Sequence, residues 1–100
     1  MRKTFPLGQV VATPAVLELI ELSGATPAQF LDRHVACDWG DVDENDKLAN
    51  DTALVGGTRL VSSYALPGHK HEKVLVITEA DRSATTIMLS TSKSIPKKGE

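Results

Sequence analysis

The sequence predicts an α+β fold, in which a short N-terminal strand and three helices precede a three-stranded antiparallel β-meander. Two Thr-Pro pairs, which are typical of helix starts, occur at residues 13–14 and 26–27. The chain after Gly57 is instead rich in β-branched residues and is divided by turn signals. Because helical and strand segments are separated along the chain, we expect the helices to pack on one face of the sheet.

The first strand and the first helix are predicted within residues 9–24. Residues 9–12 have the sequence Gln-Val-Val-Ala and form the candidate strand. Thr13 suits the N-cap of the helix, Pro14 suits its first turn, and Gly24 is a natural stop. The side chains expected to face the core from this helix are Val16, Leu17 and Ile20.

The second helix is predicted to begin at Thr26 and Pro27, where Gln29 completes a capping box. The residues expected to share one face of this helix are Phe30, Leu31, His34 and Val35. We interpret His34 as a helix-face residue with a hydrogen-bonded ring rather than as a catalytic base.

A third helix is predicted over about residues 43–55. Acidic residues at its start are favoured by the free amides of a helix N-terminus. Leu48 and Val55 are seven residues apart, so we expect both to face the core. Gly56 and Gly57 then end the helix.

Strands are predicted at residues 58–66, 73–79 and 85–91, with a turn over residues 67–72 between the first two. The middle strand contains four consecutive apolar residues at 74–77, so both of its faces are apolar. The helices can cover only one face of the sheet. We expect the N-terminal segment or a second copy of the chain to cover the other face, and a second copy would form a homodimer through it.

Composition indicates a single domain over residues 1–91, followed by a flexible basic tail over residues 92–100. The net charge of −2 and the four aromatic residues do not favour a nucleic-acid-binding surface. No apolar run approaches the roughly 20 residues that span a bilayer, so no membrane partner is expected. Cys37 is the only cysteine, which fits a cytoplasmic location.

The candidate binding residues lie in two segments. Those expected to contact a protein partner are Asp38, Trp39, Asp41, Asp43, Glu79, Asp81 and Arg82. The first segment is an acidic loop before the third helix, in which Trp39 is interpreted as a packing anchor. The second is a charged hairpin turn. There, Arg82 is expected either to pair with Glu79 and Asp81 or to reach across to the loop at residues 38–41.

No catalytic residue, metal ligand or cofactor is assigned from the sequence. Asp41, Asp43 and Asn45 have the spacing of a calcium loop, but Asp46 replaces its glycine and Thr52 its bidentate glutamate. The softer ligands considered for zinc are His34, Cys37, His69 and His71. Their spacing does not indicate a zinc site. The one-turn separation of the first two is too common to indicate a nucleophile and its base.

Several motifs resemble those of a family of small uncharacterised proteins from bacterial plasmids, phages and integrative elements. The motifs are LGxVVATP from residue 7, HVxxDWGD from 34, ND at 50–51, GxRLxSxY from 57 and ITEADRSxTT from 77. The resemblance covers about residues 7–89. Family members usually have glycine where this chain has Cys37. Some are labelled restriction–modification subunits, although a DNA methyltransferase would need a glycine-rich nucleotide loop and a longer chain.

The resemblance implies a non-enzymatic interaction protein of a mobile genetic element. We expect it to bind a host defence or nucleic-acid-processing complex, in the manner of an anti-restriction or anti-CRISPR protein. The alternative is an accessory protein that binds nucleic acid through cations, namely Arg59, Lys70, Lys73, Arg82 and the lysine tail. A third hypothesis is an enzyme in which Glu79, Asp81 or Asp41 acts as an acid–base group or magnesium ligand.

Overall fold

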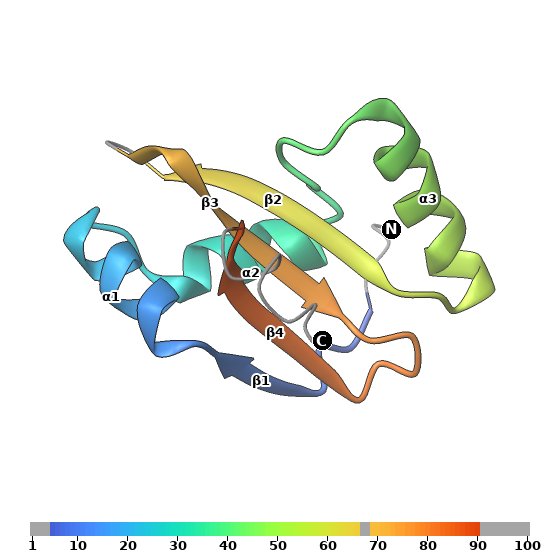
Figure 1. Cartoon of the computed structure of the whole chain (residues 1–100). Coiled ribbons are helices and arrows are strands. Elements are labelled where there is room, and N and C mark those ends of the chain that lie inside the picture. Colours follow the sequence, from blue (N-terminus) through green and yellow to red (C-terminus); the bar gives the residue numbers. More distant parts are fainter. Residues whose placement is uncertain (1–4, 67–68, 91–100) are drawn as a thin grey trace, which may run out of the picture.

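The computed structural model describes residues 5–66 and 69–90, and within these residues the chain forms three helices and one four-stranded sheet (Figure 1). In chain order the elements are β1 (Gln9–Ala12), α1 (Pro14–Leu22), α2 (Pro27–Val35), α3 (Glu44–Gly56), β2 (Leu60–Leu66), β3 (His69–Thr78) and β4 (Ala84–Leu89). The α+β class is therefore confirmed. The expected tail at residues 92–100 lies outside the described residues.

The sheet is mixed, so the prediction of a three-stranded antiparallel meander is wrong. Strands β2, β3 and β4 are antiparallel neighbours, but β1 joins them as a fourth strand, and the strand order is β1-β4-β3-β2. Gln9 lies opposite Ala84 and Ala12 lies opposite Ile87, in parallel register. The pairing was missed because four residues of local pattern identify a strand without identifying its neighbour.

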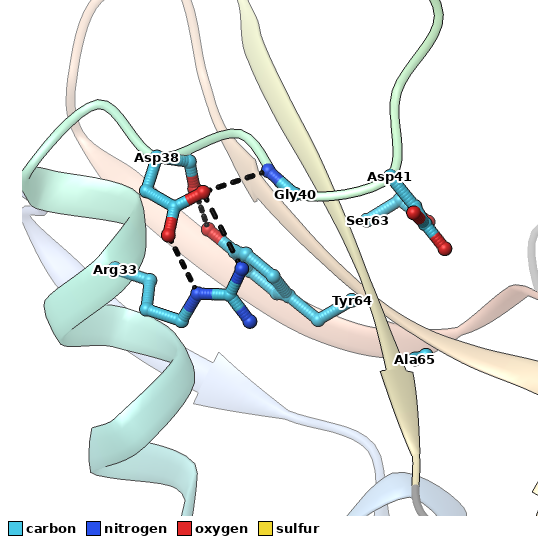
Figure 2. Close-up of a pocket in the computed structure, with 7 residues that line it drawn as sticks. All are labelled: Arg33, Asp38, Gly40, Asp41, Ser63, Tyr64 and Ala65. Carbon is cyan, nitrogen blue, oxygen red and sulfur yellow. Dashed lines mark hydrogen bonds and ion pairs between the residues drawn. The ribbon is translucent and has the colours of Figure 1, made fainter.

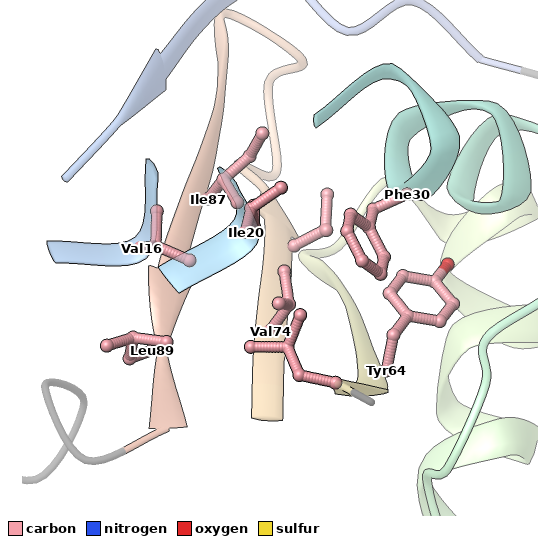
Figure 3. Packing of buried hydrophobic residues seen from close by; sticks show 9 residues of the cluster. Val16, Ile20, Phe30, Tyr64, Val74, Ile87 and Leu89 are labelled. Carbon is pink, nitrogen blue, oxygen red and sulfur yellow. The ribbon is translucent and has the colours of Figure 1, made fainter. Parts of the chain in front are cut away.

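Helices α1 and α2 cover one face of the sheet and enclose the main core (Figures 1 and 3). The buried cluster comprises Val16, Ile20, Phe30, Tyr64, Leu66, Val74, Val76, Ile87 and Leu89. Both predicted helix starts are confirmed, because Thr13 accepts a hydrogen bond from the backbone of Val16 and the Thr26 capping box is present. Leu17 is the exception within α1, since 42% of its surface is exposed.

Helix α3 packs beside β2 instead of over the sheet face (Figure 1). Asp43 caps its first turn, and Gly57 ends the helix with a φ of 76°. The glycine stop was predicted from the sequence, whereas the cap at Asp43 was not. The expectation that Leu48 faces the core is wrong, because 62% of its surface is exposed. The helix instead buries Asn50 and Ala53. The side chain of Val55 is not among those described.

The amide of Asn50 replaces a neighbouring strand at the outer edge of β2. Its Nδ2 donates to the carbonyl of Val61 over 2.7 Å, and its Oδ1 accepts from the backbone N–H of Val61 over 3.0 Å. This pair satisfies two backbone groups that an edge strand would otherwise leave unpaired. A polar residue is buried here because the edge of β2 requires a donor and an acceptor, which no apolar side chain supplies.

The described part of the N-terminal segment packs on the same side of the sheet as the helices, not on the opposite face. Phe5 belongs to a second buried cluster with Trp39, Ala53 and Leu60. The expectation that this segment covers the second face of β3 is therefore wrong for residues 5–8. The predicted turn over residues 67–72 is also shorter than expected, because β3 already begins at His69.

A chain of buried hydrogen bonds runs through His34. Its Nδ1 bonds to the hydroxyl of Ser62, and its Nε2 lies 2.9 Å from Oγ1 of Thr78. Thr78 continues the chain to Thr85 over 2.8 Å, and the Thr85 hydroxyl donates to the carbonyl of Leu7 over 2.8 Å. Because that carbonyl can only accept, the protons are ordered back along the chain and place a hydrogen on Nε2 of neutral His34.

We expect the protein to lose stability below pH 6.5 through His34. Burial, followed by the positive charge of Arg82, lowers the pKa of His34 from 6.5 to about 4. The contribution of neutral His34 is complete above the unfolded pKa of 6.5 and is lost as the pH falls through 4. The difference in pKa corresponds to about 3 kcal/mol. Urea denaturation between pH 7 and pH 4 measures the loss.

The matched control is His34→Gln, which keeps a donor and an acceptor but does not titrate. Its free energy of unfolding should fall less steeply than that of the parent over the same range, because the buried imidazole of His34 no longer contributes. Equal pH profiles for the two proteins would contradict the assignment.

Candidate functional site

The acidic loop between α2 and α3 is anchored by Trp39. Its indole is buried and packs against the ring of His34, with 5.6 Å between ring centroids. The Nε1 group donates to Oδ1 of Asp51 on α3 over 3.2 Å. The interpretation of Trp39 as a packing anchor is therefore confirmed, and the loop is tied both to the core and to the helix that follows it.

Backbone pairing fixes the next residues of the loop against β2. The N–H of Ser63 donates to the carbonyl of Trp39 over 3.1 Å, and the N–H of Asp41 donates to the carbonyl of Ser63 over 2.6 Å. Gly40 lies between these bonds with a φ of 75°, and a Cβ atom there would be 2.2 Å from the Ser63 carbonyl oxygen. Only glycine fits this close approach.

Arg33, Asp38 and Tyr64 form a cluster where the loop leaves α2 (Figure 2). Nε of Arg33 donates to Oδ2 of Asp38 over 2.8 Å, and the guanidinium lies 4.5 Å from the centroid of the Tyr64 ring. The Tyr64 hydroxyl donates to the backbone carbonyl of Asp38 over 2.6 Å. Arg33 of α2 and Tyr64 of β2 thus hold the loop to the helix and to the sheet.

An open cavity of about 250 Å³ lies beside this cluster. Its lining residues are Arg33, Asp38, Gly40, Asp41, Ser63, Tyr64 and Ala65 (Figure 2). Asp38 is paired with Arg33, and Asp41 receives a 2.7 Å hydrogen bond from Nζ of Lys73. Because each carboxylate is bound by a cation, neither is poised as a general base. We interpret the cavity as part of a binding surface.

Ion pairing keeps the groups of this cavity in their ordinary charge states at neutral pH. The hydrogen bond from Arg33 lowers the pKa of Asp38, and the same bond raises the pKa of Arg33. The hydrogen bond from Lys73 lowers the pKa of Asp41. Burial raises the pKa of Tyr64 to about 12, so its hydroxyl remains a donor.

Arg82 binds backbone carbonyls at the β3–β4 turn, which corrects both predictions for its contacts. Its acceptors are the carbonyl oxygens of Ala53, Thr58, Glu79 and Ala80, at 2.7 to 3.3 Å. Ala53 lies in the last turn of α3, and its carbonyl also accepts a hydrogen bond from the N–H of Gly57 over 2.8 Å. The guanidinium therefore joins the hairpin to the C-terminal end of α3. The recorded bonds involve neither the Glu79 and Asp81 carboxylates nor the loop at residues 38–41.

The seven candidate residues lie in two segments that meet at the buried cluster of Phe5, Trp39, Ala53 and Leu60. Asp43 caps the N-terminal end of α3, next to the loop that carries Asp38, Trp39 and Asp41. Arg82 and its turn lie at the opposite end of this helix (Figure 1). A helix of 13 residues is roughly 20 Å long, so Asp43 and Arg82 lie far apart. Trp39, however, stacks on Phe5, and the Arg82 guanidinium lies 5.8 Å from the centroid of that Phe5 ring. The turn is interpreted as structural, and the loop as the candidate site.

The side chains considered for a metal site or for catalysis are not arranged for either role in the described part of the chain. Asp41 pairs with Lys73 and Asp43 caps α3, so neither side chain is arranged as in a calcium loop. Among the residues described, no group of three or more histidine, cysteine or acidic side chains is placed to hold a metal. The side chains of residues 69 and 71 lie outside that set. Both ring nitrogens of His34 are bonded to β2 and β3, not to Cys37.

The cations proposed for nucleic-acid binding are partly engaged within the protein. Lys73 pairs with Asp41, and Arg82 binds four carbonyls. Arg59 is exposed, and no hydrogen bond or ion pair is recorded for it within the described residues. The side chain of Lys70 and the lysine tail lie outside those residues.

Comparison with protein-family models, curated proteins and solved structures finds no match for this chain. The family resemblance therefore remains a prediction based on motifs. No helix in the described part of the chain is long and apolar enough to cross a membrane.

Sequence reasoning missed the groups that hold the loop in place. Arg33, Ser63 and Tyr64 were not assigned to the site, although all three bond to it or pack beneath it. Arg33 stands five residues before Asp38, across a helix end, which is a detectable signal for an ion pair. The pairing of Ser63 with the loop leaves no comparable signal, because it joins segments more than 20 residues apart.

We expect Cys37→Gly to be more stable than Cys37→Ala. Cys37 has a φ of 65°, a left-handed conformation that disfavours any residue with a Cβ atom. Both variants remove the thiol and its contacts, so their difference isolates the backbone strain, which is about 1 kcal/mol. Urea denaturation followed by the fluorescence of Trp39, the only tryptophan, measures it. Equal stabilities would contradict a strained backbone at this position.

Replacing Arg82 with lysine should destabilise the protein by about 1–2 kcal/mol, because a single ammonium cannot reach the carbonyls that the planar guanidinium bonds together. The matched control is Arg59→Lys, which alters an exposed arginine without a recorded bond and should change stability by less than about 0.5 kcal/mol. Thermal and urea unfolding of both variants give the comparison. A similar small effect for both would show that the carbonyl contacts contribute little.

Proposed function

We propose that this chain is a non-enzymatic binding protein of a mobile genetic element, which presents the acidic segment at residues 38–51 to a basic surface on a protein partner. The partner belongs to the host's defence or nucleic-acid-processing machinery. The mobile-element origin rests on the motif resemblance. The binding mode rests on the charge and rigidity of the segment.

Charge separation along the chain is the observation that carries this proposal. The segment at residues 38–51 contains six acidic residues and one lysine, a net charge of −5, whereas the whole chain has a net charge of −2. The remainder of the protein is therefore net positive. Such a local field speeds encounter with a basic patch and sets the orientation of docking, even when the overall charge is small.

The acidic groups divide into those that shape the loop and those that remain available. Asp38 and Asp41 are held in ion pairs, so they stabilise the loop conformation. Glu44 and Asp46 are exposed on the first turn of α3. Leu48 follows them with 62% of its surface exposed. An apolar side chain bordered by charged ones resembles the arrangement at the centre and rim of protein interfaces.

Because the loop is already rigid, we expect it to bind a partner without first having to fold on contact. The buried Trp39, the backbone pairing at Ser63 and the close fit of Gly40 all restrict its conformation before any partner arrives. A surface that is already ordered loses less conformational entropy on association. The acidic face can therefore act as a fixed template for complementary cations.

The test reverses the charge of the available acidic groups. We expect the double variant Glu44→Lys, Asp46→Lys to lose activity against a defence system on which the parent protein acts. Phage plating efficiency is measured in cells that each carry one restriction or CRISPR system. The parent should raise plating at least tenfold for one system, and the double variant should not.

The matched control is Glu18→Lys, Glu21→Lys, which makes the same change of net charge at exposed positions of α1. It should retain the activity of the parent. Equal loss in both double variants would indicate that net charge, not the acidic segment, matters. No effect of the parent on any system would contradict the proposed class of partner. Binding to the purified target complex should also weaken as salt rises, because exposed charges are screened.

A further inference from the structure

The two edges of the sheet differ in how they are protected. The outer edge of β2 is occupied, because Asn50 bonds to Val61 and residues 39–41 bond to Ser63. Among residues 5–66 and 69–90, nothing covers the outer edge of β1 in this way, and no hydrogen bond is formed on that side (Figure 1). Open strand edges with unpaired N–H and C=O groups are templates for another strand.

The register of β1 identifies which backbone groups are available. Gln9 donates to the carbonyl of Ser83 over 3.0 Å, and Thr13 donates to that of Ile87 over 3.1 Å. Backbone groups alternate in direction along a strand, so those of Gln9, Val11 and Thr13 point toward β4. The N–H and C=O groups of Val10 and Ala12 therefore point away from the sheet.

The side chains near this edge do not protect it from pairing. Edge strands commonly carry charged residues or proline that prevent association, but β1 has the sequence Gln-Val-Val-Ala. Val10 and Val11 each expose 43% of their surface. Among the described residues, four of the five exposed large apolar side chains lie on β1 and α1: Val10, Val11, Leu17 and Leu22.

We propose that β1 pairs with β1 of a second copy of this chain, antiparallel and about a twofold axis at Val11. Val10 of each copy then exchanges both backbone hydrogen bonds with Ala12 of the other, and the two Val11 side chains face each other. The two sheets become one sheet of eight strands. This interface lies at the edge of the sheet and differs from the homodimer through the sheet face considered from the sequence.

We favour a second copy of the chain as the partner of β1. In a twofold interface the same strand of both copies meets, so the strand must be compatible with itself. An uncharged strand satisfies this condition, whereas a charged one would repel its own copy. The outer edge of β2 is bonded at Val61 and Ser63, so this part of the edge cannot extend the sheet beyond two chains. Because the paired strands are short, we expect dissociation in the micromolar range.

Sedimentation equilibrium from about 1 to 200 μM tests the assembly, with dimer expected at the upper end. Val11→Glu and Val11→Lys should each be monomeric, because like charges then face each other. A mixture of the two should form a heterodimer, which shows that both variants are folded and that residue 11 meets residue 11. A monomeric parent protein throughout this range would overturn the proposal, and so would dimers that persist in both single variants.

Cross-linking tests the register. In the Cys37→Ala background, Val11→Cys should oxidise to a covalent dimer, because directly opposed residues that do not share hydrogen bonds lie about 4.5 Å apart, within disulfide range. Leu48→Cys in the same background is the matched exposed control and should cross-link at least tenfold more slowly. Equal rates for the two cysteines would refute pairing at β1.

Discussion

The hydrogen-bonded chain through His34 is the constraint on which the rest of the structure depends. It joins α2 to β2 and β3, continues to β4 through Thr85, and ends at Leu7 before β1. Displacing any of these segments would leave a buried polar group without a partner, which costs more than the bond itself contributes. The same ring packs against Trp39, so the position of the acidic loop follows from the core.

Charged residues divide between internal support and the surface offered to a partner. Arg33 and Arg82 both bind groups at helix ends, and Lys73 holds Asp41 across the edge of the sheet. Arg33 and Lys73 lie outside the acidic segment yet hold its loop in place. What remains exposed at the start of α3 is acidic, although the protein as a whole is close to neutral.

Local signals were reliable guides to where helices begin and end. The caps at Thr13 and Thr26 depend on a few adjacent residues, and both were predicted. Burial was harder to predict, as the exposed Leu48 and the buried Asn50 demonstrate. Apolar spacing shows which side chains share a helix face. It does not show that the neighbour of that face is a strand edge requiring polar partners.

The sequence by itself determined the fold class, the order of helices and strands, the helix caps at Thr13 and Thr26 and the acidic character of residues 38–51. Only the tertiary structure decided that β1 lies parallel to β4, and that Arg82 bonds to carbonyls near the end of α3 instead of to the acidic loop. The physical reason is the separation in sequence over which each kind of interaction acts. Capping and charge density act between residues close in sequence, whereas strand pairing and carbonyl contacts join segments that only folding brings together.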